Sequence, residues 1–100
     1  MECHRSDLGN QTTYEIRGSV TFADQNPMRQ IHADICSGSM SEVILEMGAV
    51  DFIDSGALGM LLLLREGAKQ HGAVLKLRGP SQQVLRVLKN AKLEELFEAI

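Results

Sequence analysis

The segment Val43–Glu66 constrains the fold more than any other part of the chain, because it joins the most apolar stretch of the sequence to an unusual turn. Its first residues indicate a short buried strand, and Ala57–Leu64 indicates a helix. Between them lie Asp54, Ser55 and Gly56. Because Asp is a preferred N-cap residue, we expect Asp54 to cap the helix and Ser55 to be its first residue.

A serine at a helix start lies beside backbone N–H groups that have no partner within the helix. These groups and the helix dipole both favour negative charge, so the position suits an anion. The alternative is that Ser55 is itself the cap and has no further role.

The faces of this helix follow from a rotation of about 100° per residue. One side is expected to face the core and carries Ala57, Met60, Leu61, Leu64 and Ala68. The other side carries Ser55, Leu58, Leu62, Arg65, Glu66 and Lys69. Leu58 and Leu62 would then form a small apolar patch beside Ser55 that suits a partner surface. Coverage of both leucines by another element of the same chain is equally compatible with the spacing.

Composition narrows the classes of function. A chain of 100 residues with 44% apolar content is predicted to be a single domain. Its net charge of −3 and four aromatic residues argue against nucleic-acid binding, and it has no basic run for anionic lipid. The two cysteines and three histidines match no zinc spacing, so we expect free thiols, no metal and no cofactor.

Targeting signals are absent from the sequence pattern. Met1–Thr13 is polar and lacks the apolar middle of a signal peptide. The longest uninterrupted apolar run, Met60–Leu64, is far too short to span a membrane. We therefore expect a cytoplasmic protein that does not insert into a membrane.

The rest of the chain alternates between strand and helix signals. Strands are predicted at 14–22, 43–47 and 73–78, and the first should place Tyr14, Ile16, Val20 and Phe22 on one face. Helices are predicted from Asn26-Pro27, from Ser55 to about His71, after Ser81, and over the last residues from Leu93. Asn26 and Ser81 are the expected caps of their helices, and the first of these helices carries Met28, Ile31 and Ile35 at helical spacing. This order indicates an α/β fold with a central sheet, parallel neighbours and helices covering at least one face.

Catalytic patterns are missing. The chain has no GxxxxGK[ST] phosphate loop, and Ser55 does not lie in a GxSxG elbow. Asp51 and Asp54 are three residues apart, but we interpret Asp51 as a solvated turn residue and Asp54 as the cap. The protein is therefore not expected to be an enzyme.

The sequence Phe52–Leu62, FIDSGALGMLL, resembles the signature of the STAS domain, and specifically of single-domain anti-sigma factor antagonists that carry D-S-S-G-L-G. The similarity extends over about Thr13–Phe97. It implies a STAS fold, in which a central mixed β-sheet has helices packed mainly on one face. Residues 1–100 would form a single STAS domain, with residues 1–12 loosely ordered.

The resemblance also implies roles for particular residues. Ser55 matches the serine that a dedicated kinase phosphorylates, with Asp54 and Gly56 supporting it. The partner-binding positions are Leu58, Gly59, Leu62, Thr21 and Asp24. Three positions depart from the family pattern: Gly56 replaces the second serine, Ala57 replaces the motif glycine, and Thr21 stands where the family often has Asp.

The implied function is a partner switch. Unphosphorylated protein would bind an anti-sigma factor or a related client, and phosphorylation of Ser55 would release it. A histidine-kinase-like serine kinase and a PP2C-type, metal-dependent serine phosphatase would set the balance. The main alternative is a STAS subunit of a lipid or solute transporter that never switches. A small enzyme with Ser55 as nucleophile is a third possibility, disfavoured because no base can be named.

Overall fold

The computed structural model describes residues 1–100 and contains one five-stranded sheet in the order β1-β2-β3-β4-β5. The first pair of strands is antiparallel and the other three pairs are parallel. This mixed sheet confirms the prediction from the resemblance. The strands are β1 (Glu2–Leu8), β2 (Gln11–Val20), β3 (Glu42–Ile53), β4 (Val74–Arg78) and β5 (Glu98–Ala99).

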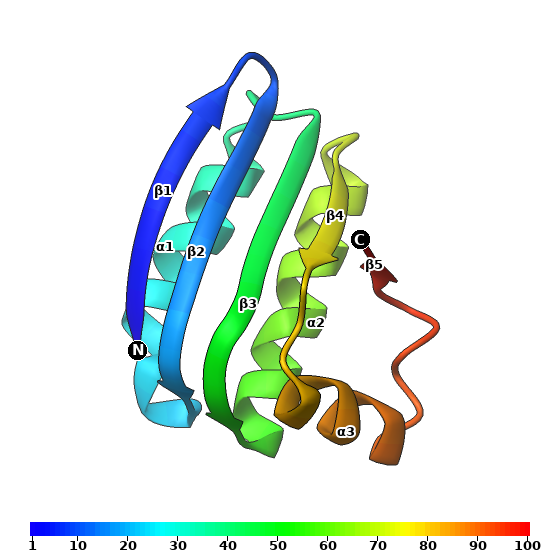
Figure 1. The fold of residues 1–100 in the computed structure, drawn as a ribbon. Helices are drawn as coiled ribbons and strands as arrows, with labels where there is room; N and C mark the ends of the chain where they lie inside the picture. The colour runs from blue at the N-terminus through cyan, green and yellow to red at the C-terminus, as the bar shows by residue number, and fades with distance from the viewer.

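Three α-helices and one 3₁₀ helix connect these strands. Figure 1 shows α1 and α2 side by side behind the sheet, whereas α3 lies across one end of it. Helices packed mainly on one face were expected, and the structure confirms them. The helices are η1 (Phe22–Asp24), α1 (Gln25–Cys36), α2 (Ser55–Gln70) and α3 (Gln82–Asn90).

The core lies between the sheet and helices α1 and α2. Alternate residues of β2 point toward the helices, as the period-two pattern predicts, and Tyr14, Ile16 and Val20 are buried. Helix α1 contributes Met28, Ile31 and Ile35 at helical spacing, also as predicted. The β3 strand is longer than expected and runs on through Gly48 to Ile53, so it delivers the chain directly to Asp54.

The N-terminal prediction was wrong. Residues 1–12 were expected to be loosely ordered, but Glu2–Leu8 forms an edge strand that pairs along its whole length with β2. Almost all of its side chains are exposed, which is why its composition resembles that of a loop. Gly9, with φ of +61°, makes the tight turn into β2.

The C-terminal prediction was also wrong. A helix was expected from Leu93, but the chain turns at Lys92, whose φ is +58°, and ends in the short strand β5. The Ile100 N–H donates to the Leu77 carbonyl at 2.8 Å, and the Gly79 N–H donates to the Ile100 carbonyl at 3.0 Å. Phe97 is buried, so the apolar spacing correctly indicated that this residue packs against the domain. It did not indicate the backbone conformation of the segment.

Phe22 was expected on the buried face of a strand, but it is 61% exposed and begins η1. Thr21 ends the strand, because its Oγ1 accepts from the Ala23 N–H at 3.2 Å. The Asp24 carboxylate in turn accepts from the Thr21 N–H at 2.8 Å, which completes a capping box. Helix α1 then starts at Gln25, one residue before the predicted cap.

Candidate functional site

The turn between β3 and α2 is built around the Asp54 carboxylate. Its Oδ1 accepts from the Ala57 N–H at 2.8 Å, so Asp54 caps α2 as predicted. Its Oδ2 accepts from the Phe22 N–H at 3.2 Å. One carboxylate therefore joins the ends of two neighbouring parallel strands, β2 and β3, at the edge where sites in such sheets gather.

Ser55 is the first residue of α2, as predicted, and it is exposed. Because the Asp54 carboxylate holds the first turn of the helix, the Ser55 hydroxyl is not needed as a cap. The hydroxyl is accessible at the positive end of a 16-residue helix. A group added to this oxygen would meet solvent and the backbone dipoles of the first turn.

The predicted patch of Leu58 and Leu62 requires correction. Leu58 is only 8% exposed and belongs to the main core cluster, and Leu62 is half-buried against it. Both leucines lie on the flank of the buried face of α2, next to Ala57, Leu61 and Leu64. The exposed stripe of α2 runs instead through Ser55, Gly59 and Leu63, each four residues apart.

Gly59 was among the predicted partner-binding residues, and it does lie on the exposed stripe. Two exposed apolar residues were not predicted. Leu63 is 62% exposed and Phe22 is 61% exposed. The spacing of Leu63 from Ser55 could have identified the first, whereas the position of Phe22 depends on the Thr21 cap. We call Phe22, Met60 and Leu63 the apolar rim.

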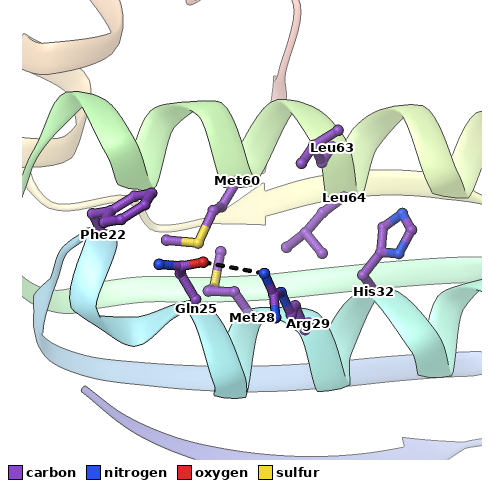
Figure 2. A pocket seen from close by; sticks show the side chains of 8 residues that line it. All are labelled: Phe22, Gln25, Met28, Arg29, His32, Met60, Leu63 and Leu64. Carbon is purple, nitrogen blue, oxygen red and sulfur yellow. Dashed lines mark hydrogen bonds between the residues drawn. The ribbon is translucent and has the colours of Figure 1, made fainter.

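Figure 2 shows that the apolar rim borders a hollow between α1 and α2. The hollow has a volume of about 260 Å³. Met28 and Leu64 are buried at its base, and Gln25, Arg29 and His32 complete its lining. Ser55 thus lies on the same side of the molecule as an open apolar surface.

The position of Phe22 explains why residue 56 is glycine, where the family pattern has a second serine. A Cβ atom at position 56 would lie 2.8 Å from the Cβ of Phe22 and 3.1 Å from its ring. The aromatic residue therefore approaches the first turn of α2 more closely than any side chain at position 56 would permit. Glycine and phenylalanine form a matched pair next to Ser55.

Thr21 and Asp24 lie in the η1 turn beside this pair. Asp24 accepts from the Thr21 N–H and from the Met1 amino group at 3.1 Å. These contacts, the Thr21 bond first, lower the pKa of the Asp24 carboxyl. Both side chains are therefore engaged in holding η1, and their predicted contact with a partner stays a prediction.

Other chemistry-bearing residues are separate from this site. Asp51 is exposed and accepts from the Ser19 hydroxyl at 3.2 Å, so it does not pair with Asp54. Cys3 and Cys36 are free and half-buried. No group of three acidic, histidine or cysteine side chains is arranged to hold a metal ion. None of the helices is long and apolar enough to cross a membrane.

The fold and site define an α/β protein with a mixed sheet, helices on one face, and an exposed serine after a capping aspartate. The chain belongs to the STAS domain family, whose model matches residues 4–100. A STAS-domain containing protein of Pseudomonas aeruginosa (strain UCBPP-PA14) is 29% identical over 90 residues, which are 90% of this chain and 88% of that protein.

Solved structures show the same fold. The anti-sigma factor antagonist SpoIIAA in its unphosphorylated form has a TM-score of 0.76 at 17% identity, over 99% of this chain and 88% of that one. The phosphorylated form of SpoIIAA from Bacillus has a TM-score of 0.77 at 16% identity, over 99% and 91%. A sulfate transporter family protein from Wolinella succinogenes has a TM-score of 0.76 at 24% identity, over 87% and 70%.

Proposed function

We propose that this protein is a phosphorylation-controlled partner-switching regulator of the anti-sigma factor antagonist type. The unphosphorylated form binds an anti-sigma factor or a related client, and phosphorylation of Ser55 releases that client. The observation that carries this proposal is an exposed Ser55 at the start of α2, on the side of the molecule that displays the apolar rim. The existence of SpoIIAA in two phosphorylation states supports it.

The physical basis is that a phosphate on Ser55 would have two different surroundings, the N-terminus of α2 on one side and the partner surface on the other. A phosphate adds about −1.5 to −2 charges. The N-terminus of α2 tolerates that charge, because its dipole and N–H groups favour an anion. A dry partner surface over Phe22 and Leu63 does not tolerate it, since burying an unpaired charge costs several kcal/mol.

That cost is sufficient for a switch. Moving an equilibrium from almost fully bound to almost fully free needs a differential of roughly 5.5 kcal/mol between the two states. One phosphate at the edge of an apolar interface supplies a penalty of this order. The switch therefore needs no rearrangement of the STAS domain itself.

In this proposal the protein is a substrate and a ligand but not a catalyst. A histidine-kinase-like serine kinase modifies Ser55, and a PP2C-type serine phosphatase reverses the modification. Both act in the cytoplasm. Thr21, Asp24 and Asp54 fix the η1 turn against α2, so that Phe22 and Ser55 are presented together.

The first test is mass spectrometry of the Ser55 peptide from protein isolated from its own cells, with and without phosphatase treatment. We expect a phosphate that the phosphatase removes. A peptide that stays unmodified under every growth condition would contradict the switch.

The second test measures binding to recombinant anti-sigma factors from the same organism. Ser55→Ala should bind as tightly as the unmodified protein, whereas Ser55→Asp should bind at least tenfold more weakly. Ser39→Asp, at an exposed serine in the loop after α1, is the matched control and should change nothing. Equal binding by all four proteins would refute the proposal.

A transporter role is the second candidate, favoured by the structural similarity to the sulfate transporter family protein. In that case the surface around Ser55 is a permanent docking site. Purification of this chain in a stable complex with a membrane transporter, independent of phosphatase treatment, would establish the transporter role and exclude the switch.

A further inference from the structure

The hollow between α1 and α2 has the form of a small ligand site. Its base consists of Met28 and Leu64, which are 2% and 1% exposed. Phe22, Met60 and Leu63 form its upper wall in Figure 2. Two of these five side chains are methionines, whose flexible thioethers adapt to the shape of an apolar ligand.

One arginine, the exposed Arg29, borders this apolar space. In Figure 2, Gln25 and Arg29 extend from α1 toward Met60. The Arg29 guanidinium donates to the Gln25 side-chain oxygen at 3.3 Å. No carboxylate lies within 4 Å of it, whereas Arg5, Arg17 and Arg78 all form ion pairs. Arg29 therefore offers most of its donors to a ligand.

We propose that this hollow binds a free medium-chain carboxylate, with the hydrocarbon chain over Met28 and Leu64 and the carboxylate on the Arg29 guanidinium. The guanidinium fork matches a carboxylate in geometry and charge. The site goes beyond the proposed switch and does not depend on phosphorylation of Ser55.

The dimensions set the length of the chain. The α1 residues that line the hollow run from Gln25 to His32, seven residues apart, which corresponds to about 10 Å of helix. This span is an upper limit for a chain whose carboxylate lies on Arg29, and an extended chain of about eight carbons, with C–C bonds of about 1.5 Å, reaches that limit. A volume of about 260 Å³ lies just below the usual range for ligand pockets, so we expect binding in the millimolar to high micromolar range.

The test is a titration of the isotopically labelled protein followed by ¹H–¹⁵N NMR at pH 7. Three probes share the same chain and differ in charge: octanoate and octyltrimethylammonium, each below its micelle concentration, and octanol below its solubility limit. Octanoate should shift the amides of Gln25–His32 and Met60–Leu64, and should bind about tenfold more tightly than octanol. The ammonium probe should bind most weakly. No shifts with octanoate, or equal affinity for all three probes, would overturn the proposal.

Variants separate the two parts of the site. Arg29→Gln should lower the affinity for octanoate to that for octanol and leave octanol binding unchanged. Arg86→Gln, at an exposed arginine on α3, is the matched control and should bind octanoate normally. Leu63→Ser should weaken both ligands. Unchanged octanoate affinity in Arg29→Gln would refute the assigned head-group contact.

Other occupants give different results in the same experiment. If a second copy of the chain fills the hollow, the same amides shift with protein concentration in the absence of any probe. If the surface binds lipid bilayers, vesicles of anionic phospholipid broaden these signals while octanoate leaves them unchanged. Either result would overturn the proposal. Failure of octanoate to bind would not contradict the phosphorylation of Ser55, so the two hypotheses are tested separately.

Discussion

Asp54 shows how one side chain couples the parts of the candidate site. Its two oxygens accept from N–H groups that are 35 residues apart in the chain, at Phe22 and Ala57. The first contact holds an exposed aromatic residue in place, and the second starts the helix that carries Ser55. The acidic residue of the motif therefore fixes the surface around the serine as well as the helix start.

Gly56→Ser is predicted to destabilise the protein by about 1 kcal/mol. The new Cβ overlaps Phe22, and overpacking typically costs about 1–3 kcal/mol, from which the better helix propensity of serine recovers about 0.5 kcal/mol. Urea denaturation measures the change. In a double-mutant cycle with Phe22→Gly, which removes the opposing Cβ, most of the cost should disappear. Additive effects would show that Phe22 does not occupy the space above Gly56.

At the scale of single elements, α1 is tied to the two N-terminal strands through Asp34. The Tyr14 hydroxyl of β2 donates to the Asp34 carboxylate at 2.9 Å. Arg5 of β1 contacts the same carboxylate at 3.2 Å and lies over the Tyr14 ring. This group explains why a strand with mostly exposed side chains is nevertheless held in the sheet.

Tyr14→Phe tests this link through pH. Burial and the hydrogen bond to Asp34 raise the pKa of Tyr14 above its ordinary value of 10.0. The unfolded chain therefore releases the phenol proton first, so this contribution to stability is complete below pH 10 and falls as the pH rises above it. At pH 7 the variant should lose about 1–2 kcal/mol. Above pH 10 its stability should fall less steeply than that of the unmodified protein.

The measurement is urea denaturation at a series of pH values from 7 to 11. Tyr14 is the only tyrosine in the chain, so its ionisation is also visible directly as phenolate absorbance. Parallel alkaline slopes in the two proteins would contradict the assigned role of the Tyr14 hydroxyl.

Helix α2 supplies a prediction about its two faces. Leu63→Asp should change the free energy of unfolding by no more than about 0.5 kcal/mol, because the side chain is 62% exposed. Leu58→Ala should cost about 2–4 kcal/mol, because Leu58 is in the core. Only Leu63→Asp should weaken client binding while the fold is retained. Circular dichroism with thermal melting measures both variants, and equal stability losses would contradict this assignment of faces.

These elements also show what could be predicted from the sequence. Short-range rules predicted the helix caps correctly, at Asp54 and at Ser81. They also predicted the buried positions of α1. Leu58 and Leu62 were misplaced because the periodicity of a helix does not define how far a neighbouring layer covers its flanks. Phe22 was misplaced because its position depends on the Thr21 cap and on the close approach to Gly56, which is 34 residues away. The strand β5 is specified by pairing with β4 on the other side of α3, whereas β1 pairs with the adjacent β2 but exposes almost all of its side chains, so both leave little local apolar pattern.

At the scale of the whole molecule, the sheet has one covered and one open face. The open face carries charged residues in cross-strand pairs, such as Lys76 with Glu42 at 3.3 Å and Arg78 with Glu46 at 2.9 Å. The strands β2, β3 and β4 hold the core, whereas β1 and the two-residue β5 form the edges. Ser55 lies at one end of this framework, outside the core.

Amide hydrogen exchange should reflect that arrangement in both states of the proposed switch. The amides of β3 should be the slowest to exchange, and those of β5 should open most readily, because a two-residue edge strand has few contacts to lose. Ser55→Glu, as a mimic of the phosphorylated form, should leave protection in β2, β3 and β4 unchanged. It should slightly increase protection in the first turn of α2, since negative charge there stabilises a helix by about 0.3–1 kcal/mol. Loss of protection across the sheet in Ser55→Glu would mean that the charge acts by unfolding the domain and not by repelling a partner at its surface.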